Sequence, residues 1–200
     1  RYPQRSDDKV AVERSVILRA DEPAPSPGVI GWIGSGNFAS RVLIPAFAKG
    51  GAVLHTLASS GGLSAAVVGK REGFRRATTD PDTLLGSELI DTIVVTTRHD
   101  THASWARRAL EAGKHVFVEK PLALTVADTK RVAEAASRAG VVVQVGHNRR
   151  RQPANRRIKA MIDAGELGTV LQLDGMHTAS GTSLTCPRGG RIRPSARSGA

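Results

Sequence analysis

From residue 29 to residue 146 the sequence alternates short apolar runs with longer segments of helical character, and this alternation restricts the fold more than any other feature. The apolar runs are almost continuous, which is typical of strands that are covered on both faces of a sheet. Strands that alternate with helices predict an α/β fold built on a doubly wound parallel sheet. The five runs are VIGWI (29–33), AVLHTLAS (52–59), LIDTIVVTT (89–97), HVFVEK (115–120) and VVVQVG (141–146).

Start and stop signals mark helices between these runs. Residues 37–49 carry apolar side chains at helical spacing. Asp100 is the expected N-cap of a helix that ends at Gly113. Thr125 is the expected N-cap of a helix that ends at Gly140.

The turn after the first strand carries a Gly-x-Gly-x-x-Ala motif. Gly34 allows a tight turn, Gly36 lets the backbone approach a pyrophosphate, and Ala39 lets the following helix pack closely on the strand. A phosphate there would meet free N–H groups at the start of the helix, including those of Asn37 and Phe38. A glycine turn without a ligand and the similar loop of methyltransferases are the alternatives. The position of the motif in the first βαβ unit favours NAD or NADP.

The end of the second strand bears on the choice between NAD and NADP. An acidic residue at this point selects the free 2′-hydroxyl of NAD. Here Ser59 and Ser60 stand at the candidate positions, and Lys70 and Arg71 follow. This leaves room for a 2′-phosphate and slightly favours NADP, while a ribose contact from the backbone or from elsewhere is the alternative.

The third site candidate follows the strand over 89–97. Ligands of such sheets bind beyond the carboxyl ends of the strands, so Thr97, Arg98 and His102 are expected to touch the cofactor. For His102 the alternative is a residue in the first turn of a helix that packs against the sheet.

The fourth candidate is the segment Glu119-Lys120-Pro121, at the end of the next strand. The proline holds the lysine in extended geometry. A partly desolvated Lys120 could accept a proton or bind a substrate hydroxyl. A surface ion pair at a strand end is the alternative.

Net charge and cysteine content limit the other functions. The formal net charge is +11, and residues 149–200 carry ten basic residues against three acidic ones. No nucleic-acid-binding motif or aromatic interleaving accompanies this charge, so we expect no nucleic-acid partner. The single cysteine excludes an internal disulfide framework, and the sequence shows neither a signal peptide nor an apolar run long enough for a membrane span. A cytoplasmic location is expected.

Taken in order, the segments GSGNFA, TRHDTH, ALEAGKHVFVEKPLA and VGHNRR resemble the glucose–fructose oxidoreductase/inositol dehydrogenase (Gfo/Idh/MocA) family over residues 28–177. The segments GNFASRVLIPAF and TTRHDTHA are most similar in sequence to those of members that are fused behind a zinc alcohol dehydrogenase-like domain. The resemblance implies that Gly34, Gly36 and Ala39 form the pyrophosphate loop.

The same resemblance implies roles for the other strand ends. Thr97 and His102 would lie along the nicotinamide, and Glu119 would face the nicotinamide ribose. Lys120 would be the catalytic lysine, with Pro121 fixing its loop.

The resemblance also implies a second α/β domain, which supplies further substrate-site residues and the surface for oligomer formation. Only its start is expected here, with a helix over 153–164 and a strand over 169–177. The expected domains are a leader or linker over 1–27 that could end an upstream domain, a dinucleotide-binding domain over 28–148, a truncated start of the substrate domain over 149–177, and a basic, disordered tail over 178–200.

These observations predict the NAD(P)-binding domain of an oxidoreductase that transfers a hydride between a nicotinamide cofactor and a sugar, polyol or related substrate. Because the second domain is expected to be incomplete, we expect cofactor binding with weak or absent turnover. The alternative is a non-catalytic protein that senses NAD(P).

Overall fold

The computed structural model describes residues 14–21 and 28–172 of the chain. It divides into two compact units, Arg1–Arg150 and Arg151–Ala200. Most of the linker expected before residue 28 and the whole tail expected over 178–200 lie outside the described residues.

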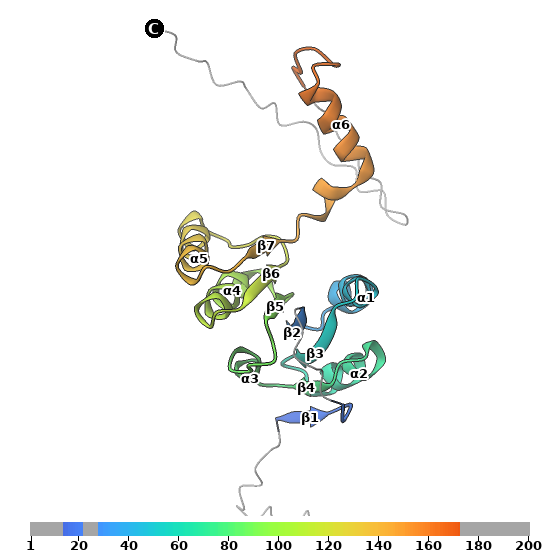
Figure 1. Cartoon of the computed structure of the whole chain (residues 1–200), viewed down its shortest axis with the longest axis vertical. Coiled ribbons are helices and arrows are strands. Elements are labelled where there is room, and N and C mark those ends of the chain that lie inside the picture. The colour runs from blue at the N-terminus through green and yellow to red at the C-terminus, as the bar shows by residue number, and fades with distance from the viewer. Residues whose placement is uncertain (1–13, 22–27, 173–200) are drawn as a thin grey trace, which may run out of the picture. The chain divides into compact units, whose positions relative to one another are not determined.

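A seven-stranded sheet forms the centre of the first unit, with the strand order β1-β4-β3-β2-β5-β6-β7 (Figure 1). All neighbouring strands are parallel except β1 and β4. The chain moves outward from β2 in one direction and then returns to continue in the other, which confirms the doubly wound sheet. The strands are β1 (Ser15–Ile17), β2 (Val29–Ile33), β3 (Val53–Ala58), β4 (Arg76–Thr78), β5 (Thr92–Val95), β6 (His115–Val118) and β7 (Val143–Val145).

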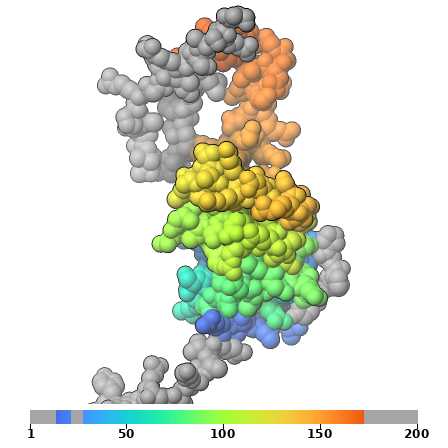
Figure 2. All heavy atoms as spheres, turned by 90° about the vertical axis from the view of Figure 1, so that its left-hand side faces the viewer, coloured from blue at the N-terminus to red at the C-terminus, as the bar shows by residue number. Residues whose placement is uncertain are grey.

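Helices cover both faces of the sheet. On one side α4 and α5 lie next to each other, as the green and yellow segments of Figure 2 show. The helices of the first unit are α1 (Ile44–Lys49), α2 (Gly62–Glu72), α3 (Asp82–Leu85), α4 (His102–Glu111) and α5 (Val126–Ala139), with a π-helical turn η1 (Ala39–Leu43) and the 3-10 turns η2 (His99–Thr101) and η3 (Asn148–Arg151), the last of which reaches the start of the second unit.

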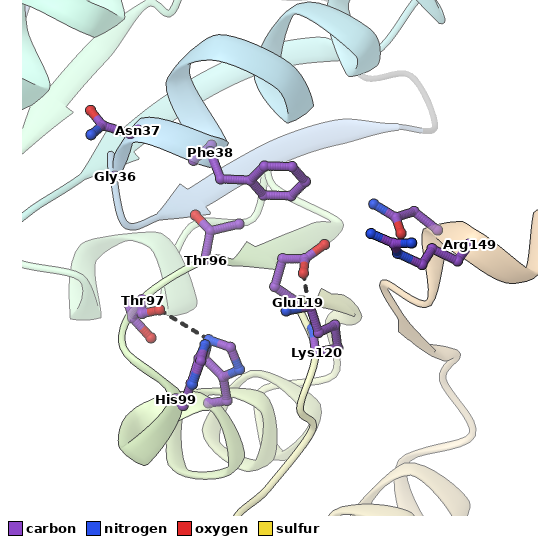
Figure 3. Close-up of a pocket in the computed structure, with 12 residues that line it drawn as sticks. Gly36, Asn37, Phe38, Thr96, Thr97, His99, Glu119, Lys120 and Arg149 are labelled. Atoms are coloured by element: carbon purple, nitrogen blue, oxygen red, sulfur yellow. Dashed lines mark hydrogen bonds between the residues drawn. The ribbon is translucent and has the colours of Figure 1, made fainter. Parts of the chain in front are cut away.

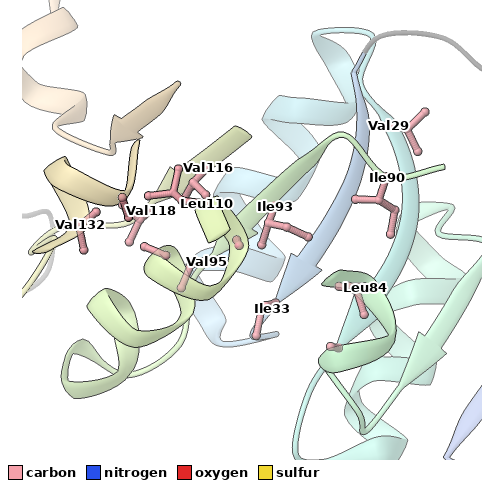
Figure 4. Packing of buried hydrophobic residues seen from close by; sticks show 14 residues of the cluster. Val29, Ile33, Leu84, Ile90, Ile93, Val95, Leu110, Val116, Val118 and Val132 are labelled. Carbon is pink, nitrogen blue, oxygen red and sulfur yellow. The ribbon is translucent and has the colours of Figure 1, made fainter. Parts of the chain in front are cut away.

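Two hydrophobic clusters lie on the opposite faces of the sheet, which explains the continuous apolar runs. Along β2, Val29 and Ile33 belong to one cluster, whereas Ile30 and Trp32 belong to the other. The first cluster packs strand residues such as Val118 against α4 and α5 (Figure 4). Strands buried on both faces are those of a parallel sheet between two helical layers.

The predicted helix ends are partly confirmed. Thr125 caps α5 by accepting a hydrogen bond from the Asp128 N–H at 3.0 Å, and Gly140 ends the helix with a φ of +66°. Asp100 is not an N-cap, because a 3-10 turn over His99–Thr101 precedes α4 and no side chain caps that helix.

Two strands lie outside the five predicted strand runs. β4 follows α2, and β1 pairs with it in antiparallel register, so Ser15–Ile17 extend the sheet although residues 1–27 were expected to precede the domain. In the second unit α6 (Pro153–Asp163) matches the expected helix. Residues 169–172 form no strand, and the rest of the strand expected up to 177 lies outside the described residues.

Candidate functional site

A cavity of about 450 Å³ lies where β2, β5 and β6 end (Figure 3). Its position matches the rule that doubly wound sheets bind ligands beyond the carboxyl ends of their strands. The lining residues come from the glycine turn, the segments after β5 and β6, and the start of η3: Gly36, Asn37, Phe38, Ala39, Thr96, Thr97, His99, His102, Glu119, Lys120, Asn148 and Arg149.

The first glycine of the turn is required by the fold. Gly34 has a φ of +103°, and a Cβ on it would lie 2.7 Å from the carbonyl oxygen of Thr96. The Gly34 N–H also donates to the carbonyl oxygen of Ala58 at 2.8 Å. The close approach of this turn to β5 therefore leaves no room for a side chain.

The second glycine is in open space. A Cβ on Gly36 would meet no atom within 4 Å, although Gly36 lines the cavity. Packing within the chain does not require a glycine here, so the missing side chain leaves room for a ligand beside the backbone.

A π-helical turn follows the glycines. In the i→i+5 pattern of η1, the Ile44 N–H donates to the carbonyl oxygen of Ala39. The next donor would be the N–H of residue 45, but Pro45 has none, and the Arg71 Nη2 instead donates to the carbonyl oxygen of Ser40 at 3.0 Å. Because the Arg71 guanidinium is bonded to the backbone of η1, it does not support the predicted preference for NADP, which relied on a basic side chain near a 2′-phosphate.

The segment after β5 joins the glycine turn through Thr96. Its hydroxyl accepts a hydrogen bond from the Trp32 indole at 2.8 Å and donates to the carbonyl oxygen of Gly34 at 2.9 Å. Thr97 also lines the cavity, whereas Arg98 does not. The guanidinium of Arg98 pairs instead with Asp100 at 3.2 Å, and its side chain is 85% exposed.

His102 lines the cavity but is almost fully buried, with 1% of its surface exposed. Its Nδ1 lies 2.7 Å from the carbonyl oxygen of Pro121, and its Nε2 lies 3.0 Å from the carbonyl oxygen of Thr97. Both ring nitrogens therefore face the backbone of the protein.

Glu119 presents a buried carboxylate to the cavity. Its Oε2 accepts a hydrogen bond from the Lys120 N–H at 3.1 Å, whereas its Oε1 is buried and has no hydrogen-bond partner among the described residues. A Cβ on Gly146 would overlap Oε1, so this glycine makes room for the carboxylate. A buried acceptor without a donor is costly unless a ligand supplies the donor. Lys120, joined to Pro121 by a cis peptide bond, is exposed beside it.

The structure thus brings eight of the predicted site residues together around the cavity, and Ser59 is not among its lining residues. Ser59 follows β3 and is half-buried, and its N–H donates to the carbonyl oxygen of Thr78 at 3.0 Å. The prediction missed Thr96 and His99, which stand in the same polar segment as Thr97, and it gave no site role to Asn148 and Arg149.

A second cavity of about 470 Å³ lies over α4 and α5 and is lined mainly by charged side chains. Two of its carboxylates pair with a neighbour on their own helix, Glu111 with Arg107 at 2.7 Å and Asp128 with Arg131 at 2.9 Å. The Asp128 carboxylate accepts hydrogen bonds from the Thr125 hydroxyl and from Arg131. These bonds, the one from Thr125 most of all, lower the pKa of Asp128 below its ordinary value.

Two features are absent from residues 14–21 and 28–172. No group of three or more His, Cys, Asp or Glu side chains there could hold a metal ion. None of the helices in these ranges has the length and apolar character needed to cross a membrane.

Residues 29–147 match the profile of the GFO_IDH_MocA oxidoreductase family, described as having an NAD-binding Rossmann fold. Among curated relatives, scyllo-inositol 2-dehydrogenase (NAD(+)) of Bacillus subtilis is 37% identical over 54% of this chain and 32% of its own length. The 1,5-anhydro-D-fructose reductase of Ensifer adhaerens is 34% identical over 69% of this chain and 41% of its own length. The chain thus spans well under half of these relatives.

Solved structures of oxidoreductases are also similar to this chain. Levoglucosan dehydrogenase, in complex with NADH and levoglucosan, is 30% identical with a TM-score of 0.64, over 70% of this chain and 40% of its own. The 3-ketoreductase KijD10 from Actinomadura kijaniata, in complex with NADP and TDP-benzene, is 29% identical with a TM-score of 0.65, over 70% of this chain and 43% of its own.

Proposed function

Because this chain belongs to the Gfo/Idh/MocA oxidoreductase family and carries its NAD-binding domain, we propose that the cavity at the ends of β2, β5 and β6 binds NAD or NADP. The observation that carries the proposal is the convergence of Gly36, Glu119 and Lys120 from two separate strand ends. Two features fit a dinucleotide: the open space at Gly36 suits a phosphate, and the unpaired Glu119 Oε1 suits a hydroxyl donor.

Each part of the cavity then has a distinct task. The backbone N–H groups after Gly36 bind the pyrophosphate. Glu119 Oε1 accepts a hydrogen bond from a ribose hydroxyl and so fixes the nicotinamide end of the cofactor. The bound nicotinamide supplies hydride transfer, and Lys120 holds or moves the proton of a substrate hydroxyl at its Nζ. Thr97 also lines the cavity, and Pro121 follows Lys120 in the segment after β6.

The curated relatives act on inositols and an anhydro sugar, so we propose a sugar, a polyol or a related alcohol as the substrate class. We expect the 200-residue chain by itself to bind the cofactor with weak or absent turnover. Detectable dehydrogenation of inositols or sugars by this chain would contradict that expectation.

Calorimetric titration of the chain with NADPH, NADH and S-adenosylmethionine tests the proposal. We expect saturable binding of at least one nicotinamide dinucleotide and none of S-adenosylmethionine. Gly36→Val should weaken dinucleotide binding at least tenfold without lowering the melting temperature, because a Cβ at this position would meet no atom of the described residues within 4 Å. Binding of S-adenosylmethionine alone, or unchanged binding by Gly36→Val, would refute the proposal.

A further inference from the structure

His102 occupies an unusual position at the start of α4. Its imidazole is buried, and both of its nitrogens lie within hydrogen-bond distance of backbone carbonyl oxygens, those of Pro121 and Thr97. A carbonyl oxygen can only accept a hydrogen bond. A neutral imidazole donates from one nitrogen and carries a lone pair on the other. Only the doubly protonated ring can therefore make both bonds.

The two carbonyl oxygens belong to different parts of the cavity. Thr97 follows β5, and Pro121 follows β6 and comes directly after Lys120. A ring that donates to both oxygens fixes the distance between the two segments. Their cavity-facing side chains, Thr97 and Lys120, are thereby held in place without any contact between the ring nitrogens and a ligand.

Other titratable groups lie close to the ring. The His99 imidazole is 5.6 Å away between ring centroids, in an edge-to-face arrangement. Glu119 and Lys120 share the cavity with His102, while Asp100 pairs with Arg98.

We propose that His102 is a positioning residue which, as an imidazolium, ties the Thr97 and Pro121 carbonyl oxygens together and so sets the affinity for the nicotinamide half of the cofactor. This inference rests on the proposed function, since it assumes that a nicotinamide dinucleotide occupies the cavity. It differs from the role implied by the family resemblance, because His102 acts through two backbone groups.

The protonation state can be measured directly. Two-bond ¹H–¹⁵N correlation spectra of the ¹⁵N-histidine-labelled chain separate imidazolium rings from neutral tautomers. The His102 signals, assigned by their loss in His102→Gln, should show two protonated nitrogens near neutral pH. A neutral tautomer for His102 under these conditions would overturn the inference.

Affinity measurements test the positioning role. His102→Phe keeps an aromatic ring but has no donor, whereas His102→Gln keeps one side-chain N–H donor. We expect His102→Phe to bind NADH roughly tenfold more weakly, the size of effect expected for a hydrogen bond to a charged group, and His102→Gln to fall between it and the wild type. Binding of ADP, which lacks the nicotinamide and its ribose, should be unchanged in both variants.

The outcomes separate the two proposals. If the wild-type chain binds neither NADH nor NADPH, the proposed function fails. If the wild type binds NADH and both variants bind it equally well, only the role of His102 fails. Equal losses for NADH and ADP in His102→Gln, with a lowered melting temperature, would show a purely structural residue and would also overturn the inference.

Discussion

The two glycines of the turn after β2 are needed for different reasons. The positive φ of Gly34 and its approach to Thr96 are demands of the fold, since the backbone of one strand end passes directly over the next. Gly36 has neither constraint, and its open surroundings belong to the cavity. A stability measurement can therefore separate a glycine that the fold needs from one that the ligand needs.

We predict that Gly34→Ala lowers the free energy of unfolding by roughly 2 kcal/mol or more, because the added Cβ overlaps the Thr96 carbonyl in a strained backbone conformation. Urea denaturation, monitored by circular dichroism, measures the change in the free energy of unfolding. Gly36→Ala is the matched control and should stay within about 0.5 kcal/mol of the wild type. Equal losses in both variants would contradict this account of the turn.

Our second prediction concerns Ser59, which follows β3, and the relative affinity of the chain for NADPH and NADH. With serines at positions 59 and 60 and no acidic side chain to repel a 2′-phosphate, the chain should bind NADPH a few times more tightly than NADH. Ser59→Asp should reverse the order by binding the ribose hydroxyls and repelling the phosphate. Competition binding with both dinucleotides checks this, and an unchanged order would show that the ribose is bound elsewhere.

Parts of the site could be predicted from sequence and others could not. The glycine turn and Glu119-Lys120 follow strand ends, and the topology of a parallel sheet brings strand ends together. The buried contacts of His102 and the dependence of Glu119 on Gly146 join segments 19 and 27 residues apart. No local pattern encodes such contacts, since they depend on how each loop leaves its strand.

At the scale of the elements, the π-helical turn after the glycines depends on a donor from another helix. Pro45 removes the N–H that would reach Ser40, and Arg71 replaces it. We predict that Arg71→Met destabilises the chain by about 1 kcal/mol or more, because it removes this hydrogen bond together with the contact between Arg71 and Glu72 at 2.6 Å. In the Pro45→Ala background, where residue 45 has its own N–H, the same change should cost less. Equal effects in the two backgrounds, by urea denaturation, would contradict the substitution of donors.

The start of α5 makes a prediction about pH. Because the pKa of Asp128 is lowered in the folded chain, its ionised form contributes stability above the ordinary carboxyl value of 3.8. This contribution is lost as the pH falls from there through the lowered pKa. The difference in urea midpoint between the wild type and Asp128→Asn should therefore shrink from pH 6 to pH 3.5. A constant difference would contradict the Thr125–Asp128 interaction as its source.

The longer helices and strands were predictable because their apolar pattern and end signals agree, whereas the four-residue helix α3 was not predicted. The three-residue strands β1 and β4 were not predictable, since a segment of this length has no measurable period. Arg76 is exposed within β4, which removes the apolar signal as well. Asp100 was misplaced as an N-cap because a 3-10 turn, which local sequence does not distinguish from a first helical turn, precedes α4.

At the scale of the whole molecule, the described part of the first unit forms one continuous sheet whose central strands meet at a single cavity. The glycine turn contributes one end of that cavity, and Lys120 contributes another. A single extended ligand that touches both would explain why the Gly36 position is open and why Glu119 has an unpaired oxygen. This is the central claim, and it concerns the unit rather than any one residue.

The most direct test is an amide ¹H–¹⁵N titration of the ¹⁵N-labelled chain with NADPH or NADH, whichever binds more tightly. We predict that the signals of Gly36, Asn37 and Lys120 shift together and yield one dissociation constant, while the signal of Arg138, at the second cavity, stays in place. Shifts confined to one end of the first cavity, or centred on Arg138, would contradict a dinucleotide that spans the ends of β2 and β6.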